Sequence, residues 1–173
     1  MKNWYLLSIV GKDRPNIVAK LSAVLCNNNC NLGDSSMARL GNNFVIMLAV
    51  QFNGSQEALK NIVSPIAGSF NLNQHIIKID EGTHHIEPDV RINLFAEDRI
   101  GIIEDATRML TEAGLNILSL ESNLNSTESN KTYSIHIEGT VAKGIQPLYN
   151  ALDYLLDIKQ IQSQLIPINA QAT

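Results

Sequence analysis

Two short charged turns hold the side chains best suited to chemistry. Each supplies an aspartate, an arginine and a third residue two positions later: Asp13, Arg14 and Asn16 in the first, and Asp98, Arg99 and Gly101 in the second. Each turn stands between an apolar strand pattern and an amphipathic helix pattern, so the aspartates are expected to cap the helices. A helix N-terminus also offers free N–H groups and a positive dipole end, which suit a carboxylate ligand. Both interpretations, cap and ligand site, remain open.

Two neighbouring residues bear on these alternatives. Pro15 fits the first turn of a helix, where its missing N–H is not needed. Gly101 would let the backbone approach a ligand closely. Asn31 and Asn116 form a second candidate pair, at the start of the strand pattern after each helix. A side-chain amide could hold both the amine and the carboxylate of an amino acid, although asparagine is also common in helix-to-strand turns.

The two turns belong to an internal repeat. The segment that begins at Asp13 recurs at Asp98, an offset of 85 residues (98 minus 13). The same offset carries one apolar helix face onto another: Ile17, Leu21, Val24 and Leu25 correspond to Ile102, Ala106, Met109 and Leu110. This spacing of i, i+4, i+7 and i+8 predicts one helix with a single buried face in each copy.

Apolar runs predict the other elements. Strands are expected at 4–10, 30–40, 44–52 and 73–79 in the first copy, and at 90–95, 115–124, 132–138 and 159–166 in the second. A second helix in each copy is indicated by apolar stripes, namely Leu59, Ile62, Val63 and Ile66, and Ile145, Leu148, Leu152, Leu155 and Leu156. The offset then grows to 89 (133 minus 44), which places an insertion in the polar segment 125–130, as expected for an exposed hairpin tip.

Each copy is therefore predicted to have the order βαββαβ, which gives an α+β, ferredoxin-like fold. Such a unit has a four-stranded antiparallel sheet with two helices on one face. The predicted domains are 1–80 and 89–173, joined by a linker at 81–88 that lacks periodicity. One sheet face stays uncovered in each unit, so we expect pairing of units or of chains.

The composition argues against several classes of protein. A net charge of -4 gives no support for direct binding to nucleic acid, which requires clustered Lys and Arg. The strand pattern Phe44–Phe52 carries no basic residue, which also argues against an RNA-recognition module. No run of 18 apolar residues occurs and the start does not read as a signal peptide, so we expect a soluble cytoplasmic protein without a membrane span.

Catalysis and metal binding are not indicated by the sequence. The two cysteines, Cys26 and Cys30, lack companion ligands and are expected to be buried apolar side chains. No nucleophile–base pair is formed by the four histidines, which are His75, His84, His85 and His136. No phosphate-binding loop occurs either. We expect no enzyme activity, no metal and no cofactor.

These residues resemble the ACT domain, in which a strand ends in Asp-Arg-Pro-Gly-hydrophobic and Gly-x-Asn-Ile opens the strand after the helix. The pattern occurs here as Asp13–Ile17 with Asn29–Leu32, and as Asp98–Ile102 with Gly114–Ile117. A stand-alone pair of this length most resembles the glycine cleavage system transcriptional repressor family. That resemblance implies a regulator that lacks a DNA-binding module, responds to glycine, contacts a LysR-type activator and forms homo-oligomers through ACT sheets. The alternative is a ligand-free ACT interaction module that controls an enzyme of amino-acid metabolism.

The resemblance also implies which residues bind an amino acid, often across a domain interface. The matching positions are Asp98, Arg99, Gly101, Asn116 and Ile117, and Asp13, Arg14, Asn16, Asn31 and Leu32. Within the turn each copy departs from the motif once, because Asn16 replaces glycine and Ile100 replaces proline. Since the Asn16 side chain would crowd the backbone, the second copy is expected to be the better ligand site.

Overall fold

The computed structural model describes residues 3–80, 86–126 and 131–168. The chain divides into two compact units, Met1–His84 and His85–Thr173. The predicted linker 81–88 lies mostly outside the described residues, because residues 81–85 are not among them. The same holds for most of the predicted hairpin tip, of which residues 127–130 are outside the described residues.

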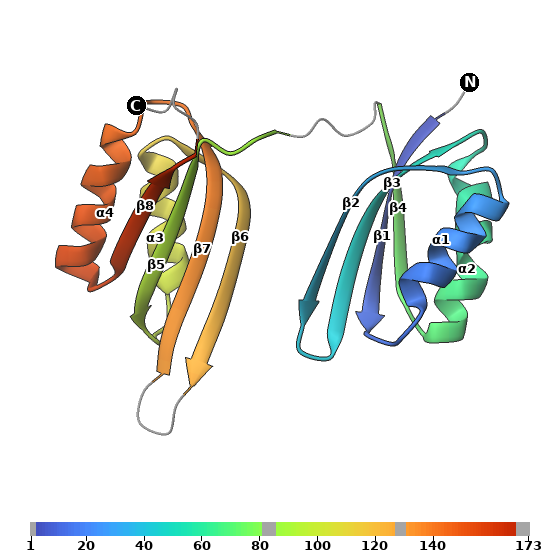
Figure 1. Ribbon diagram of the computed structural model, residues 1–173, viewed down its shortest axis with the longest axis horizontal. Coiled ribbons are helices and arrows are strands. Elements are labelled where there is room, and N and C mark those ends of the chain that lie inside the picture. The colour runs from blue at the N-terminus through green and yellow to red at the C-terminus, as the bar shows by residue number, and fades with distance from the viewer. Residues whose placement is uncertain (1–2, 81–85, 127–130, 169–173) are drawn as a thin grey trace. The chain divides into compact units, whose positions relative to one another are not determined.

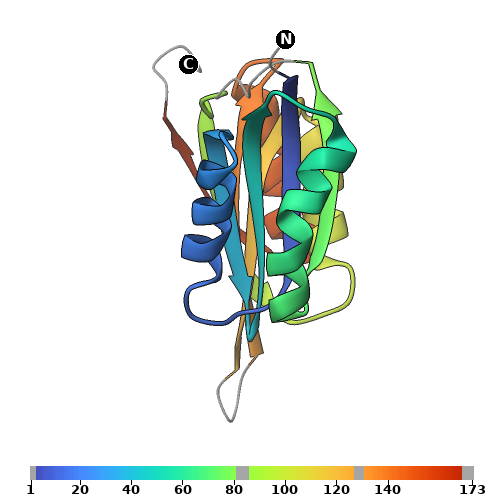
Figure 2. The ribbon, with the colours of Figure 1, turned by 90° about the vertical axis from the view of Figure 1, so that its right-hand side faces the viewer.

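The first unit has the predicted order of elements. They are β1 (Asn3–Lys12), α1 (Ile17–Asn27), β2 (Asn31–Leu40), β3 (Asn43–Phe52), α2 (Gln56–Phe70) and β4 (Asn73–Ile79). All its strand pairs are antiparallel, in the order β2-β3-β1-β4. Both helices lie over one face of this sheet (Figures 1 and 2).

The second unit repeats this topology. Its elements are β5 (Val90–Glu97), α3 (Ile102–Glu112), β6 (Leu115–Ser126), β7 (Lys131–Val141), α4 (Gln146–Lys159) and β8 (Gln162–Pro167). The sheet is antiparallel in the order β6-β7-β5-β8, with both helices on one face (Figure 1). The predicted α+β fold of two ferredoxin-like units is confirmed.

The repeated helix faces build two equivalent cores. In α1 the buried residues are Ile17, Leu21 and Leu25, and in α3 the apolar ones are Ile102, Ala106 and Leu110. Every member of each triplet lies 85 residues from its counterpart. These side chains pack on the inward residues of the sheet, such as Leu7 and Ile92, which are fully buried.

Three predictions about local structure are wrong. The last strand begins at Gln162 and not at 159, because α4 continues to Lys159 and ends where Gln160 takes a left-handed conformation. Leu156 is 45% exposed and does not belong to the buried stripe of α4. Cys26 is exposed, whereas Cys30 is buried, and burial raises the pKa of the Cys30 thiol.

The uncovered sheet faces of the two units differ in chemistry. On the first sheet the outward positions of β1, β3 and β4 are mostly apolar, including Leu6, Val10, Val45, Met47 and Ile77. On the second sheet the corresponding positions are mostly polar, including Arg91, Asn93, Glu97, His136 and Glu138. There the Arg91–Glu138 ion pair spans 2.7 Å, and the His136 ring hydrogen-bonds Asn93 at 2.8 Å.

Candidate functional site

Both charged turns have the same backbone geometry. Asn16 has φ 70° and ψ 5°, and Gly101 has φ 93° and ψ 0°. These values match the third residue of a type II turn, a position that requires positive φ and therefore favours Gly or Asn. Pro15 precedes this residue and so lies in the turn, outside the helix that begins at Ile17 and in whose first turn it was expected. A Cβ placed on Gly101 would meet nothing within 4 Å, so glycine serves the backbone conformation here.

Neither aspartate caps its helix, contrary to the prediction. The N-cap residues of α1 and α3 are Asn16 and Gly101, and neither makes a side-chain cap hydrogen bond. The aspartates instead hold the turns through their backbone N–H groups. That of Asp13 donates to Asn42 O at 2.8 Å, and that of Asp98 to Lys131 O at 2.9 Å. Among the described residues, no side chain caps the N–H groups at the start of either helix.

In the first turn the aspartate is paired and the arginine is not. Asp13 forms an ion pair with Arg39 of β2, with Nε and Oδ2 3.1 Å apart. The Arg14 side chain is exposed and makes no hydrogen bond or ion pair with any residue that the structure describes. Arg14 therefore presents an unpartnered guanidinium beside the start of α1.

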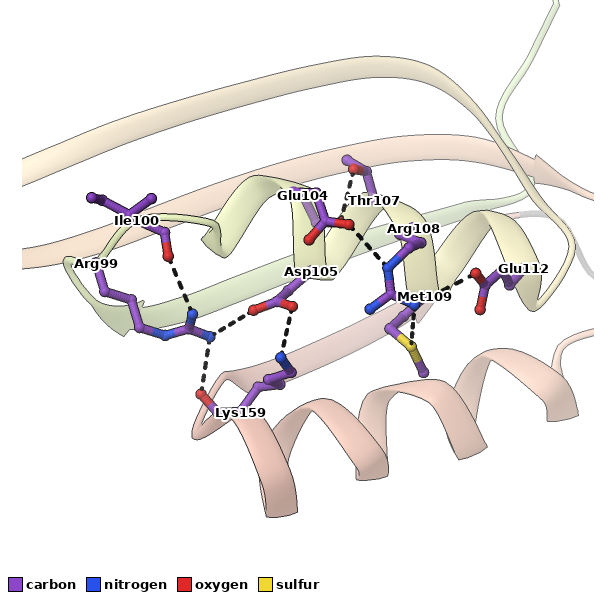
Figure 3. A network of polar contacts seen from close by, with 9 residues as sticks. All are labelled: Arg99, Ile100, Glu104, Asp105, Thr107, Arg108, Met109, Glu112 and Lys159. Atoms are coloured by element: carbon purple, nitrogen blue, oxygen red, sulfur yellow. Dashed lines mark hydrogen bonds and ion pairs between the residues drawn. The ribbon is translucent and has the colours of Figure 1, made fainter.

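In the second turn the arginine is paired and the aspartate is not. Arg99 Nη2 donates to Asp105 Oδ2 at 3.0 Å, and Lys159 Nζ lies 2.9 Å from Asp105 Oδ1. Figure 3 shows Asp105 between these two cations, at the facing ends of α3 and α4. The Asp98 side chain has no partner among the residues described here. We call Arg99, Asp105 and Lys159 the Asp105 cluster.

The Asp105 cluster is the most strongly charged buried feature among the described residues. Asp105 is 6% exposed, and it and Ser134 are the buried polar residues found there. Hydrogen bonds from Lys159 and then Arg99 lower the pKa of Asp105 below its ordinary value of 3.8. Arg99 Nη2 also lies 3.5 Å from the carbonyl oxygen of Lys159, at the end of α4. The Arg99 guanidinium is thus engaged by the Asp105 carboxylate and the Lys159 carbonyl outside the turn, and by the Ile100 carbonyl within it.

The asparagines predicted as ligand residues do not lie near the turns of their own unit. Asn31 and Asn116 follow the C-termini of α1 and α3, whereas the turns precede the N-termini. A helix of 11 residues is about 16 Å long, so one unit does not bring the two candidate sets together. Asn116 Nδ2 donates to Thr140 Oγ1 at 3.4 Å, and Leu32 and Ile117 lie beside the asparagines in β2 and β6.

The sequence reasoning missed Arg39, Asp105 and Lys159. Asp105 could have been noticed, because it follows Ile102 by three positions and so lies on the predicted buried face of α3. A carboxylate on such a face is rarely buried without a partner. The sequence pattern predicts that Lys159 opens the last strand, whereas Lys159 is the last residue of α4.

Comparison with known proteins assigns the first unit. Residues 4–69 match the family model of the ACT domain. The first unit is therefore similar to the ACT domain. The second unit has the same element order and strand order, so the chain is a tandem pair of ferredoxin-like units, the first of which matches the ACT-domain model. No helix of the described residues is long and apolar enough to cross a membrane.

Solved structures show the same fold over the whole chain. An unknown protein from Galdieria sulphuraria is 22% identical, with 98% of this chain and 100% of that chain covered and a TM-score of 0.78. A candidate glycine cleavage system transcriptional repressor is 20% identical, with 98% and 99% covered and a TM-score of 0.68. No curated protein matches the chain. At these identities the matches describe fold alone.

Proposed function

We propose that this protein is an amino-acid-responsive regulator, without catalytic activity of its own, that receives a ligand carboxylate at the first turn. The observation that carries the proposal is the exposed Arg14 guanidinium, which has no partner in the described structure. It stands beside the uncapped N-terminus of α1, whose N–H groups favour an anion. Arginine with backbone N–H groups is well suited to bind a carboxylate in two-point fashion.

The first turn is a better carboxylate site than the second for a structural reason. Asn16 adopts nearly the same backbone conformation as Gly101, so both turns present the N-terminus of their helix in the same geometry. Arg99 is engaged by Asp105, whereas Arg14 is free to meet a ligand. We therefore propose Asp13, Arg14 and Asn16 as the main ligand turn and retain Asp98, Arg99 and Gly101 as a secondary one.

A second chain would complete this ligand site. Every residue of β2 is exposed, and β2 is an edge strand, which offers unpaired backbone groups to another chain. The strand starts at Asn31 and ends near the turn, to which Asn42 is hydrogen-bonded. Antiparallel pairing of two β2 strands would therefore place Asn31 and Leu32 of one chain near the Arg14 turn of the other. This homo-oligomer joins the sheets at their edges.

The regulatory target is proposed from similarity. The fold match to a candidate glycine cleavage system transcriptional repressor favours glycine as the ligand and transcription as the process. A net charge of -4 favours action through a protein, for which we propose a LysR-type activator, over direct contact with DNA. Co-purification of the two proteins should change with glycine, and tight binding of this protein alone to promoter DNA would contradict the scheme.

A ligand-free ACT interaction module is the second candidate. The separation of each turn from the asparagine of its own unit favours it, because a single unit lacks a closed ligand site. Such a module would control an enzyme of amino-acid metabolism by contact alone. Its response to amino acids separates it from the first candidate.

A thermal-shift screen of the full chain against the amino acids tests the proposal. A ligand at 100 times its Kd adds about 2.7 kcal/mol of stability. Arg14→Gln should abolish the shift given by glycine, whereas Lys12→Gln, which removes an exposed cation two residues earlier, should preserve it. If no amino acid shifts the melting temperature, or if both variants respond equally, the Arg14 site is wrong.

A further inference from the structure

The Asp105 cluster occupies a position that the first unit fills in another way. The 85-residue offset places Lys20 at the position of Asp105, and the last residues of α2 and α4 are Phe70 and Lys159. In the first unit Lys20 Nζ lies 5.0 Å from the centre of the Phe70 ring, a cation–π contact. Among the described residues, no carboxylate pairs with Arg14. The two units thus have the same turn, with an arginine that is held only in the second.

Asp105 needs a cation to neutralise its charge, but it does not need both Lys159 and Arg99. Asp105 is buried, so a loss of both cations would leave an uncompensated charge in a poorly solvated place. Its two oxygens have separate partners, Lys159 on Oδ1 and Arg99 on Oδ2. Arg99 can therefore leave while Lys159 still neutralises the carboxylate. The side chain of Arg99 is 40% exposed, which leaves room for it to turn outward.

We infer that Asp105 withholds Arg99 from ligand carboxylates, so that the second turn is a latent carboxylate site while the first is an open one. The inference rests on the proposed function, because it assumes that an amino-acid carboxylate binds at these turns. Asp105 is a positioning residue, since it acts through Arg99 and does not contact the ligand. A ligand at the second turn must exchange with Asp105 for the guanidinium, and Lys159 keeps Asp105 neutralised after the exchange.

The hollow beside the second turn is consistent with this exchange. It is lined by Asp98, Arg99, Gly101, Ile103, Glu104 and Tyr133, among others. Glu104 is engaged with Arg108 on the adjacent helix turn, with Nε and Oε1 3.0 Å apart. The cation that faces the hollow is therefore Arg99, and its availability decides whether a carboxylate is accepted. If Arg99 is free in about a tenth of molecules, the apparent affinity is about tenfold weaker than the intrinsic one.

The first test needs no ligand. Phenylglyoxal modification of the full chain, followed by mass spectrometry, reports how available each arginine is. In the wild type we expect Arg14 to react several-fold faster than Arg99. Asp105→Asn should raise the rate at Arg99 toward that of Arg14. The matched control Glu104→Gln removes a neighbouring carboxylate of α3 and should leave Arg99 unchanged. Equal rates at Arg99 in the wild type and in Asp105→Asn would overturn the inference.

A graft guards against failure of Asp105→Asn to fold. The double change Lys20→Asp with Phe70→Lys builds the Asp105 cluster at the first turn, whose backbone is equivalent. It should slow the modification of Arg14 several-fold and leave Arg99 as it was. A graft that folds, by circular dichroism, and does not protect Arg14 counts against the inference.

Calorimetric titration with glycine tests the ligand step. We expect about one glycine per wild-type chain and about two per Asp105→Asn chain, with the added site lost in Asp105→Asn/Arg99→Gln. Faster modification of Arg99 without added glycine binding would overturn the latent site while leaving the Arg14 site intact. Absence of glycine binding in both proteins, in contrast, would count against the proposed glycine response, and the modification rates would still decide whether Asp105 withholds Arg99.

Discussion

The two turns share a backbone and make opposite use of the same charged pair. In the first, the aspartate pairs with Arg39, and in the second the arginine pairs with Asp105; the other member of each pair has no partner among the described residues. Neither Arg39 nor Asp105 belongs to the repeated motif. The difference teaches that a motif can preserve conformation while residues outside it decide which charge is presented.

The residues that determine the core and the turn are repeated in both units, whereas the partners of the charged residues are not. Apolar residues at helical spacing and a residue that tolerates positive φ recur in both units, and they determine the core and the turn. The partners of the charged residues come from β2 in one unit and from α3 and α4 in the other. Substitutions at matched positions of the two units should therefore test the comparison directly, and those in the core should have the largest effect.

Matched truncations in the two cores should have the largest effect. Leu25 and Leu110 are both fully buried and lie 85 residues apart. We expect each change to alanine to lower the free energy of unfolding of its own unit by about 2–5 kcal/mol, through lost burial and a residual cavity. Hydrogen exchange with mass spectrometry should show lost protection only in the unit that carries the change. Equal loss in both units would mean that they do not fold as separate bodies.

An exchange of the turn residues should have the next effect. Gly101→Ala places a Cβ at φ 93°, and we expect a cost of about 1–2 kcal/mol from the backbone alone, because nothing lies within 4 Å. Asn16→Gly should be neutral or should stabilise the first unit by up to about 1 kcal/mol, because glycine adopts the φ of 70° without a steric cost. Urea titration measures both. A gain of stability in Gly101→Ala would contradict the requirement for positive φ.

Acid should distinguish the two units at the position of Asp105. The folded-state pKa of Asp105 is lowered, so its contribution to stability is present above its unfolded pKa of about 3.9 and is lost as the pH falls through the folded value. Asp105→Asn should therefore weaken the fold at neutral pH and flatten the dependence of stability on pH below about 4. The matched change Lys20→Gln should leave that dependence unaltered, and a wild-type acid response in Asp105→Asn would contradict the ion cluster.

The uncovered sheet faces should give the smallest change in stability. Met47 is 42% exposed on the first sheet, and the 89-residue offset places His136 at the matched outward position of the second. We expect Met47→His and His136→Met each to change the free energy of unfolding by no more than about 0.5–1 kcal/mol. Binding of an apolar fluorescent dye should fall in the first variant and rise in the second. Unchanged dye binding in both would show that these faces do not differ in apolar exposure.

The sequence predicted the structure well where a residue pattern has one dominant physical cause. Apolar periodicity predicted α1 and α3, and the repeat predicted that both units share a topology. The prediction that Asp13 and Asp98 cap the helices is wrong, because both lie several residues before the first helical residue. Their backbone N–H groups, and not their side chains, tie each turn to the neighbouring hairpin.

The ion pairs could not be predicted from the sequence, because each joins two segments that the tertiary structure brings together. Lys159 meets Asp105 only because α4 runs for its full length beside α3, and Arg39 meets Asp13 only because β2 ends next to the turn. The ligand residues stay predictions.

Asp105 also has a consequence for how such a protein can change over generations. Codons for aspartate and asparagine differ by a single base, so the Asp105 carboxylate can be lost in one mutational step. That step retains the shape of the side chain and leaves the repeated motif intact. If Asp105 withholds Arg99, the number of effector molecules that a chain counts can then rise or fall without any change to its fold. A duplicated fold can thus carry one open and one closed form of the same turn.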